Sequence, residues 1–97
     1  MRIISEKTLS EYWKAHAETR GPLEAWLEFV RRTKWKKPTD AQKAYGDDVV
    51  ISSRRLVFNI KGNHYRLVAD VHYSSGILFI RFIGTHAEYN RIDAKTI

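Results

Sequence analysis

The sequence predicts an α+β fold in which N-terminal helices pack on one face of a small antiparallel β-sheet. Up to about residue 45, apolar residues recur at three- and four-residue spacing, which is typical of amphipathic helices. From Arg54 onward, apolar and polar residues alternate, which is typical of half-buried strands. The 97 residues are enough for one domain and too few for two, so we expect a single domain over residues 1–97.

Two helices joined by a tight corner are expected in the first third of the chain. Ser5 can cap the first helix, Gly21 can end it, and Pro22 suits the start of the second. Residues 39–42 have the spacing of a capping box for a short third helix, which Gly46 would stop. The predicted apolar faces of the first two helices consist of Leu9, Tyr12, Trp13, His16 and Ala17, and of Leu23, Trp26, Leu27 and Val30. The aromatic stripe that we expect in the core is Tyr12, Trp13, Trp26 and Phe29.

Three strands and two turns should follow the helices. Residues 55–60 and 64–73 alternate between apolar and polar side chains, and residues 77–83 are strongly apolar. Turns at 61–63 and 74–76 would join these strands into an antiparallel meander, to which residues 2–4 could add a fourth strand. Because the helices cover one face of this sheet, the opposite face should be partly open, and we expect function there.

Composition narrows the classes of function. The net charge of +6 and the isoelectric point of about 9.8 favour a polyanionic partner without deciding that there is one. The chain has no cysteine, which excludes disulfides, thiol catalysis and cysteine-based zinc sites. The N-terminal residues lack the apolar core of a signal peptide, and no apolar run approaches the roughly 20 residues that span a bilayer. We therefore expect a cytoplasmic protein with no membrane partner.

Arg81 is the most informative single position, because an arginine inside an apolar strand needs an anion to pair with. It could form a salt bridge with Asp70 on the neighbouring strand. Alternatively, it could bind a phosphate on the open face through its planar guanidinium. Arg66 has the same two options. Since one aspartate cannot fully neutralise two arginines, we expect at least one of them to be available to a ligand.

Histidines at positions 64, 72 and 86 raise the question of a metal site. The sequence has no HExxH motif and no carboxylate at a recognised ligand spacing, so we expect neither a metal nor another cofactor. A ribonuclease needs no metal if the RNA 2′-hydroxyl attacks the adjacent phosphate. That route requires a proton acceptor, cations that stabilise the phosphorane, and an acid for the leaving 5′-oxygen.

If the C-terminal segment folds beside the sheet, a set of five residues could fill these roles. The candidates are Lys61, Arg66, Arg81, His86 and Tyr89. Histidine is the side chain whose ordinary pKa suits proton transfer near neutral pH. A surface or structural role for His86 is equally compatible with the sequence.

A second basic feature is the run from Arg31 to Lys37, which contains Trp35. Its cations could hold a phosphate backbone while the indole stacks on a base. It could equally be a solvated helix end, where cations interact favourably with the helix dipole. The sequence leaves both interpretations open.

Two long segments carry a resemblance to a known family. Residues 57–68, VFNIKGNHYRLV, and residues 79–89, FIRFIGTHAEY, resemble the core of the HigB toxins in the RelE-like superfamily. Residues 3–5, residues 92–97 and the tryptophan-bearing helix pair are similar as well, so the resemblance covers nearly the whole chain. It implies a compact RelE-like fold, ribosome-dependent cleavage of mRNA and inhibition of translation. It also implies a HigA-type antitoxin as partner, with operator DNA contacted only through that antitoxin.

The resemblance also implies roles for individual residues. Arg66 matches the phosphate-stabilising arginine on the central strand, Tyr89 falls near a tyrosine that some members use, and Lys61 matches a basic position near the preceding turn. His86 stands where many members have a catalytic arginine or histidine, so the division of acid and base roles is open. The residues that we expect to contact RNA are Lys36, Lys37, Arg54, Arg55, Asn63, His64, Arg91 and Lys95.

Two rival functions remain compatible with the sequence. One is a non-catalytic RNA-binding or ribosome-binding inhibitor that blocks the decoding site by occupying it. The other is a DNA-binding regulator or plain interaction module, although the sequence shows no evident recognition-helix motif.

Overall fold

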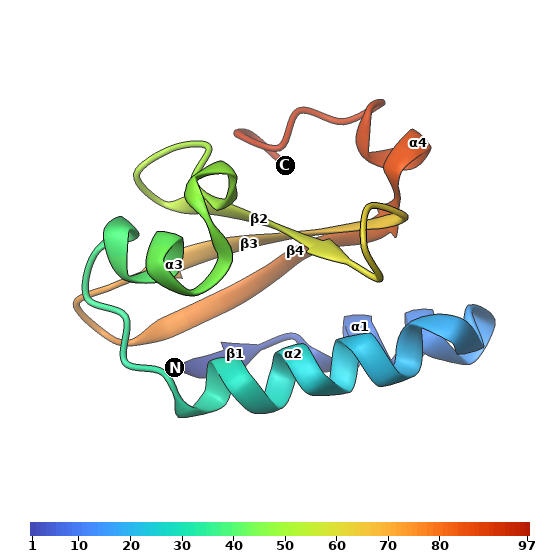
Figure 1. Ribbon diagram of the computed structural model, residues 1–97, viewed down its shortest axis with the longest axis horizontal. Helices are drawn as coiled ribbons and strands as arrows, with labels where there is room; N and C mark the ends of the chain where they lie inside the picture. Colours follow the sequence, from blue (N-terminus) through green and yellow to red (C-terminus); the bar gives the residue numbers. More distant parts are fainter.

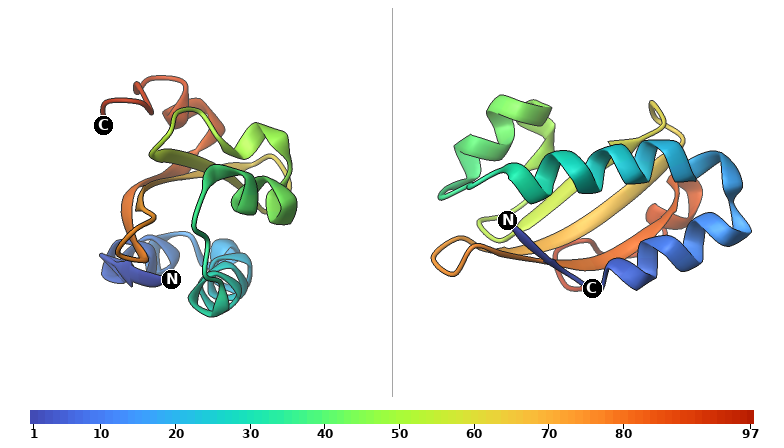
Figure 2. Two further views of the ribbon diagram at one scale, coloured as in Figure 1. Left: turned by 90° about the vertical axis from the view of Figure 1, so that its left-hand side faces the viewer. Right: turned by 90° about the horizontal axis from the view of Figure 1, so that it is seen from below.

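The computed structural model describes residues 1–97 and has the predicted α+β architecture, with a four-stranded sheet between two unequal layers (Figure 1). The strands lie in the order β1-β4-β3-β2. Helices α1 and α2 cover one face, and the C-terminal segment lies over the other (Figures 1 and 2). The strands are β1 (Arg2–Ile4), β2 (Arg55–Ile60), β3 (Tyr65–His72) and β4 (Ile77–Thr85). The helices are α1 (Glu6–Ala15), α2 (Arg20–Arg32), α3 (Pro38–Tyr45) and α4 (His86–Tyr89), with 3₁₀ turns η1 (Ala17–Thr19) and η2 (Asp47–Val49).

The sheet is mixed rather than antiparallel throughout. The meander of β2, β3 and β4 is antiparallel, as predicted. The fourth strand, β1, joins the edge beside β4 and runs parallel to it, with Ile3 paired with Leu78. The expectation of a purely antiparallel sheet is therefore wrong at this edge. Three helices and two 3₁₀ turns separate β1 from β2 in the chain, and β1 pairs with the last strand of the meander instead of the first.

The main core fills the space between the helix pair and the sheet. The predicted stripe of α2 is confirmed, because Leu23, Trp26, Leu27 and Val30 are all buried. Alternate residues of β2 and β3 meet this stripe, as the period of two predicted. The strand residues in this core include Leu56, Phe58, Ile60, Leu67, Ala69 and Val71.

The helix boundaries differ from the prediction. α1 ends at Ala15 and α2 begins at Arg20, so Gly21 and Pro22 lie in the first turn of α2 and not between the helices. Proline is tolerated there because the first amides of a helix have no partner within it. Ser5 does precede α1, but its side chain makes no capping hydrogen bond, and its φ of 71° is left-handed.

The third helix also begins differently. α3 starts at Pro38. In its first turn, the carboxylate of Asp40 accepts a hydrogen bond from the Lys36 amide at 2.8 Å. The predicted capping box beginning at Thr39 is therefore wrong. Gly46 ends this helix as predicted, with a φ of 96° that favours glycine.

Trp35 and Phe29 differ from the prediction in their burial. Trp35 is only 6% exposed and stacks on Phe58, with ring centroids 6.2 Å apart and an interplanar angle of 15°. It therefore cannot stack on a base as hypothesised. Phe29, expected in the core, is 48% exposed and contacts Tyr45 edge-on. The linker between α2 and α3 turns the indole inward, whereas Phe29 flanks the buried stripe.

No helix is both long enough and apolar enough to cross a bilayer.

Replacing Trp35 with alanine should destabilise the protein by about 3–5 kcal/mol, because it empties a buried indole site against Phe58. Phe29→Ala is the matched control and should cost about 1 kcal/mol or less, since Phe29 is half exposed. Urea unfolding followed by circular dichroism measures both. Equal losses would show that Trp35 is not a core residue.

Candidate active site

A cleft of about 620 Å³ opens between the α3–η2 connection, β2, the β2–β3 turn and α4. Its polar residues include Asn59, Asn63 and Arg66, with Asp47 and Asp48 on the η2 side. Val57, Asn59 and Arg66 belong to the sheet face away from α1 and α2, where we expected function. The cleft therefore lies on the predicted face.

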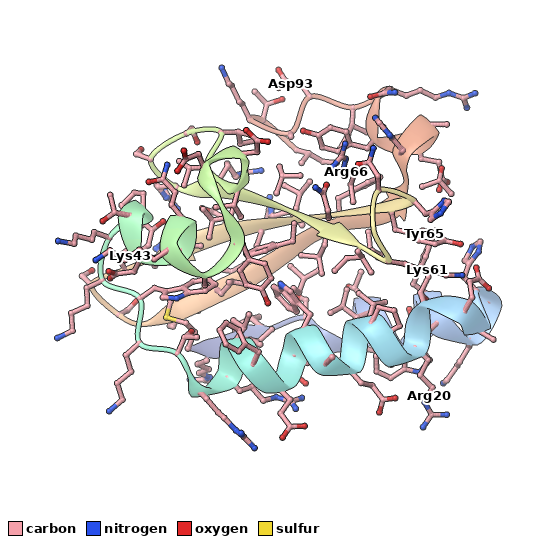
Figure 3. All side chains as sticks on the ribbon, viewed as in Figure 1. Arg20, Lys43, Lys61, Tyr65, Arg66 and Asp93 are labelled. Atoms are coloured by element: carbon pink, nitrogen blue, oxygen red, sulfur yellow. The ribbon has the colours of Figure 1, made fainter.

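Arg66 is the central cation of this cleft. It pairs across the sheet with Asn59 on β2 and Gly84 on β4, so the three residues form one row. Its guanidinium carbon lies 5.6 Å from the centre of the Tyr89 ring, within the range of a cation–π interaction. Its Nε is buried and has no hydrogen-bond partner. Figure 3 shows Arg66 on the side of the sheet that faces the C-terminal segment.

No carboxylate forms a salt bridge with Arg66, whereas five of the nine arginines of the chain have such a partner. Arg20, Arg31, Arg32, Arg54 and Arg55 all form salt bridges. Arg66 is only partly exposed, so water cannot solvate it fully. A partly buried guanidinium without an anion is poised to accept one from a ligand.

The chain leaves β4 in a way that places Tyr89 beneath Arg66. Gly84 has no side chain, and a Cβ there would lie 2.6 Å from Cζ of Phe82 and 3.1 Å from Oε1 of Glu88. Directly afterwards, Thr85 and Glu88 form a capping box. The Thr85 amide donates to the Glu88 carboxylate at 2.8 Å, and the Glu88 amide donates to the Thr85 hydroxyl at 3.1 Å. The hydrogen bond from the Thr85 amide holds the pKa of Glu88 below its usual value.

The C-terminal segment covers the middle of this sheet face. Ala94 packs on Val57 and Val68 in a second small core. Arg55 and Arg81 both donate to the carbonyl oxygen of Ile97. The segment therefore does fold beside the sheet, and it narrows the open face to the cleft. Partly buried residues that join this second core are Ile51, Phe82, Tyr89, Ile92 and Ile97.

Arg81 and Asp70 do not pair, so the salt-bridge option for Arg81 is wrong. A β-bulge lies opposite Val68 and Ala69 and leaves Arg81 as the extra residue of β4. Asp70 instead bonds Arg54 at 3.2 Å and lies 3.9 Å from Arg55. Neither Arg66 nor Arg81 uses this carboxylate, and only Arg66 lines the cleft.

The other predicted residues fall into separate groups. Asn63 and Tyr89 line the cleft with Arg66. His64 and His86 lie together at the end of the sheet, where the His86 amide donates to the His64 carbonyl at 3.0 Å. Lys61 is near Glu18, and Figure 3 shows it beside Tyr65. The exposed residues outside the cleft are Lys36, Lys37, Arg54, Arg91 and Lys95, whereas Arg55 is mostly buried.

Three cleft residues were missed from the sequence: Asp47, Asp48 and Asn59. The available signal was the pair of acids directly after a helix-ending glycine in a basic chain. Asn59 could have been found because it alternates with Phe58 and Ile60 and must face away from the main core.

A cluster of tyrosines joins the end of α1 to β3. Tyr12 stacks on His16 with ring centroids 4.2 Å apart, and its hydroxyl is buried without a partner. Burial, reinforced by the nearby charge of Glu88, raises the pKa of Tyr12 to about 12. On β3, the Tyr65 hydroxyl donates a hydrogen bond to the Glu18 carboxylate, and this bond lowers the pKa of Glu18. This packing fixes α1 against the end of the sheet that carries His64.

The sequence matches a family model over residues 19–92, and that model describes the HigB toxin, the RelE-like toxic component of a toxin–antitoxin system. The chain belongs to the HigB toxin family. The matched range contains Arg66, His86 and Tyr89. Among similar proteins, the mRNA interferase toxin HigB of Escherichia coli K12 is 28% identical over 92 residues, which is 93% of this chain and 88% of that protein. The mRNA interferase HigB of Escherichia coli O6:H1 is 22% identical over 94 residues, or 95% of this chain and 91% of that protein.

In this HigB-family chain, Gly84→Ala should destabilise the fold by about 1–3 kcal/mol, because the added Cβ displaces the Phe82 ring or α4. Gly21→Ala is the matched control. A Cβ at Gly21 meets nothing within 4 Å, and alanine in a helix should stabilise by roughly 0.5–1 kcal/mol. Thermal unfolding of the two variants should give shifts of opposite sign. A neutral Gly84→Ala would contradict the proposed close packing.

Tyr12→Phe should flatten the fall in stability at alkaline pH. The pKa of Tyr12 in the folded protein, about 12, exceeds its ordinary value of 10.0. The contribution of Tyr12 to the free energy of unfolding is therefore complete below pH 10.0, and it is lost as the pH rises towards about 12, because the unfolded chain loses its proton first. The measurement is the free energy of unfolding between these limits. At neutral pH the variant should be at least as stable as the wild type, because it loses an unpaired buried hydroxyl. A wild-type alkaline slope in the variant would refute the assignment.

Proposed function

We propose that this chain is an mRNA endoribonuclease that acts on ribosome-bound messages and so inhibits translation as the toxin of a toxin–antitoxin pair. Family membership and the relatives named mRNA interferase support the reaction class. The structural observation that carries the proposal is Arg66, a partly buried guanidinium over Tyr89 with no carboxylate partner, in a cleft of about 620 Å³.

The chemistry needs no metal, because RNA supplies its own nucleophile. A base takes the proton of the 2′-hydroxyl as the 2′-oxygen attacks the adjacent phosphorus. The bond to the 5′-oxygen then breaks, an acid protonates that leaving oxygen, and the products are a 2′,3′-cyclic phosphate and a 5′-hydroxyl. Charge develops on the phosphorane oxygens, and a fixed cation stabilises them more than it stabilises the starting phosphate. Arg66 takes this role, with its planar guanidinium bonding the non-bridging oxygens.

Proton transfer is assigned to His86 and Tyr89 at the two ends of α4, and Lys61 adds positive charge at the end of the sheet. Tyr89 lines the cleft, and its ring lies against the guanidinium of Arg66. The imidazole of His86 begins the same helix, so small movements of α4 move both groups together. Asp47 and Asp48 face the same cleft and offer carboxylates as alternative proton acceptors.

The acidic side of the cleft also gives a reason for ribosome dependence. Asp47 and Asp48 offset the charge of Arg66, so free RNA gains little attraction at this point. An mRNA held in place by the ribosome needs only to be positioned, and positioning supplies a large part of the barrier reduction. A HigA-type antitoxin would silence the toxin, operator DNA would be contacted through that antitoxin, and the site of action would be the cytoplasm.

Arg66→Ala should lower the rate of mRNA cleavage by about 100- to 1000-fold, the usual cost of losing a transition-state donor. Arg20→Ala is the control, because Arg20 is exposed and pairs only with Glu24 at 2.9 Å. Primer extension on an mRNA translated in vitro, with naked RNA alongside, measures the cuts. We expect cuts within the reading frame only when ribosomes are present. Wild-type cleavage by Arg66→Ala, or cleavage of naked RNA alone, would overturn the proposal.

The double variant His86→Ala/Tyr89→Phe separates catalysis from occupancy of the ribosome. If it still inhibits translation while leaving the mRNA intact, inhibition does not depend on cutting, and a binding-only inhibitor is favoured. If inhibition and cleavage disappear together while ribosome binding persists, the ribonuclease is supported.

A further inference from the structure

A second pocket lies far from the cleft, at the end of the sheet where β3 turns into β4. Its volume is about 350 Å³, and three segments form it: the start of β1, the α2–α3 linker and residues 73–76. Arg2, Lys34 and Lys36 supply its cations, and Tyr73 and Ser74 supply hydroxyl groups. None of these residues lines the cleft of Arg66.

The surroundings of this pocket hold most of the excess positive charge of the chain. Besides the three lining cations, Lys37 and Lys43 lie near Asp40, whose pKa is lowered mainly by the hydrogen bond from the Lys36 amide and further by the charges of these two lysines. None of these five cations forms a salt bridge. The whole chain carries a net charge of only +6. Figure 3 shows Lys43 at the opposite end of the molecule from Lys61.

The pocket is built on ordered backbone rather than on loose side chains. The Arg2 amide donates to the Gly76 carbonyl at 2.8 Å, which ties β1 to the turn. The Lys36 amide donates to Asp40 at 2.8 Å, and buried Trp35 anchors the linker between its two lysines. The Tyr73 hydroxyl is buried and has no hydrogen-bond partner. The segments that carry the cations are therefore fixed by backbone hydrogen bonds and by a buried indole.

We propose that this pocket binds backbone phosphate of RNA, separately from the phosphate that reacts beside Arg66. This inference rests on the proposed function in one respect: the function identifies RNA as the polyanion that the pocket binds. Tyr73 directly follows β3 and is seven residues from Arg66, which at about 3.3 Å per residue is about 23 Å, so the two sites contact different phosphates. The pocket provides affinity from its unpaired cations, whereas the near-neutral cleft provides chemistry. Neither site needs the other in order to bind.

The test compares two double variants with equal loss of charge. Lys34→Gln/Lys36→Gln removes two cations of the pocket, and Lys14→Gln/Arg20→Gln removes two exposed cations from the other end of the helix pair. The probe is a labelled 2′-O-methyl RNA oligonucleotide, which cannot be cleaved by its own 2′-oxygen. Fluorescence anisotropy gives Kd over a series of salt concentrations. Circular dichroism verifies that both variants are folded.

We expect the pocket variant to bind about tenfold more weakly at low salt and to lose about 1.4 from the slope of log Kd against log salt, the effect of two single-strand phosphate contacts. The control variant should change Kd by less than about twofold. Equal weakening of both variants would overturn the site, because it would show attraction to net charge alone. Equally tight, pocket-dependent binding of a poly-glutamate peptide would overturn the assignment to RNA.

The result is independent of the cleavage experiment. Pocket-dependent RNA binding by a protein that cuts no translated mRNA would support this site and refute the proposed function. Ribosome-dependent cutting together with unchanged RNA binding by Lys34→Gln/Lys36→Gln would support the proposed function and refute this site.

Discussion

The cation–π contact of Arg66 with Tyr89 depends on how the chain leaves β4. Gly84 leaves the space that the Phe82 ring occupies, and the capping box of Thr85 and Glu88 then turns the chain into α4. That turn brings the Tyr89 ring to 5.6 Å from the guanidinium. The cation is thus held by an aromatic face rather than by a carboxylate. This choice keeps the charge of Arg66 available to a ligand, since the cation–π interaction neutralises nothing.

One face of the sheet carries the main hydrophobic core, and the other carries the candidate site. On one face, α1 and α2 supply the large core that accounts for most of the buried apolar residues. On the other face, a short C-terminal segment covers only Val57 and Val68 and leaves the neighbouring row of polar residues open. Arg55 and Arg81 hold this segment through the carbonyl of Ile97. These arginines therefore hold the C-terminal segment against the sheet, and neither of them lines the cleft.

How much could be predicted from the sequence depended on whether the deciding contacts were local. The stripe of α2 and the alternation in β2 follow from periodicity, and both were correct. The parallel pairing of β1 with β4 and the bulge at Arg81 depend on partners far along the chain, so no local pattern shows them. Trp35 was ambiguous for a related reason. Its neighbours are charged, and only the position of Phe58 explains why the indole is buried.

The candidate site shows the same limit. The resemblance selected Arg66 and Tyr89, which the structure brings together, but it also selected Lys61, which lies near Glu18 outside the cleft lining. The number of charged residues alone cannot separate Arg66 from Lys61, because a sequence does not show whether a cation has a carboxylate near it in the folded protein.

The distribution of charge suggests why affinity and chemistry are kept apart. A guanidinium paired with a carboxylate would have to break that salt bridge before binding phosphate, whereas Arg66 has none to break. Conversely, many free cations in the cleft would hold RNA tightly in the ground state as well as in the transition state, and uniform binding does not raise the rate of the chemical step. One unpaired arginine opposite Asp47 and Asp48 avoids that outcome. In the proposed RNA-binding pocket, the lysines near Tyr73 can attract a polyanion strongly, because the proposed reaction takes place beside Arg66 instead.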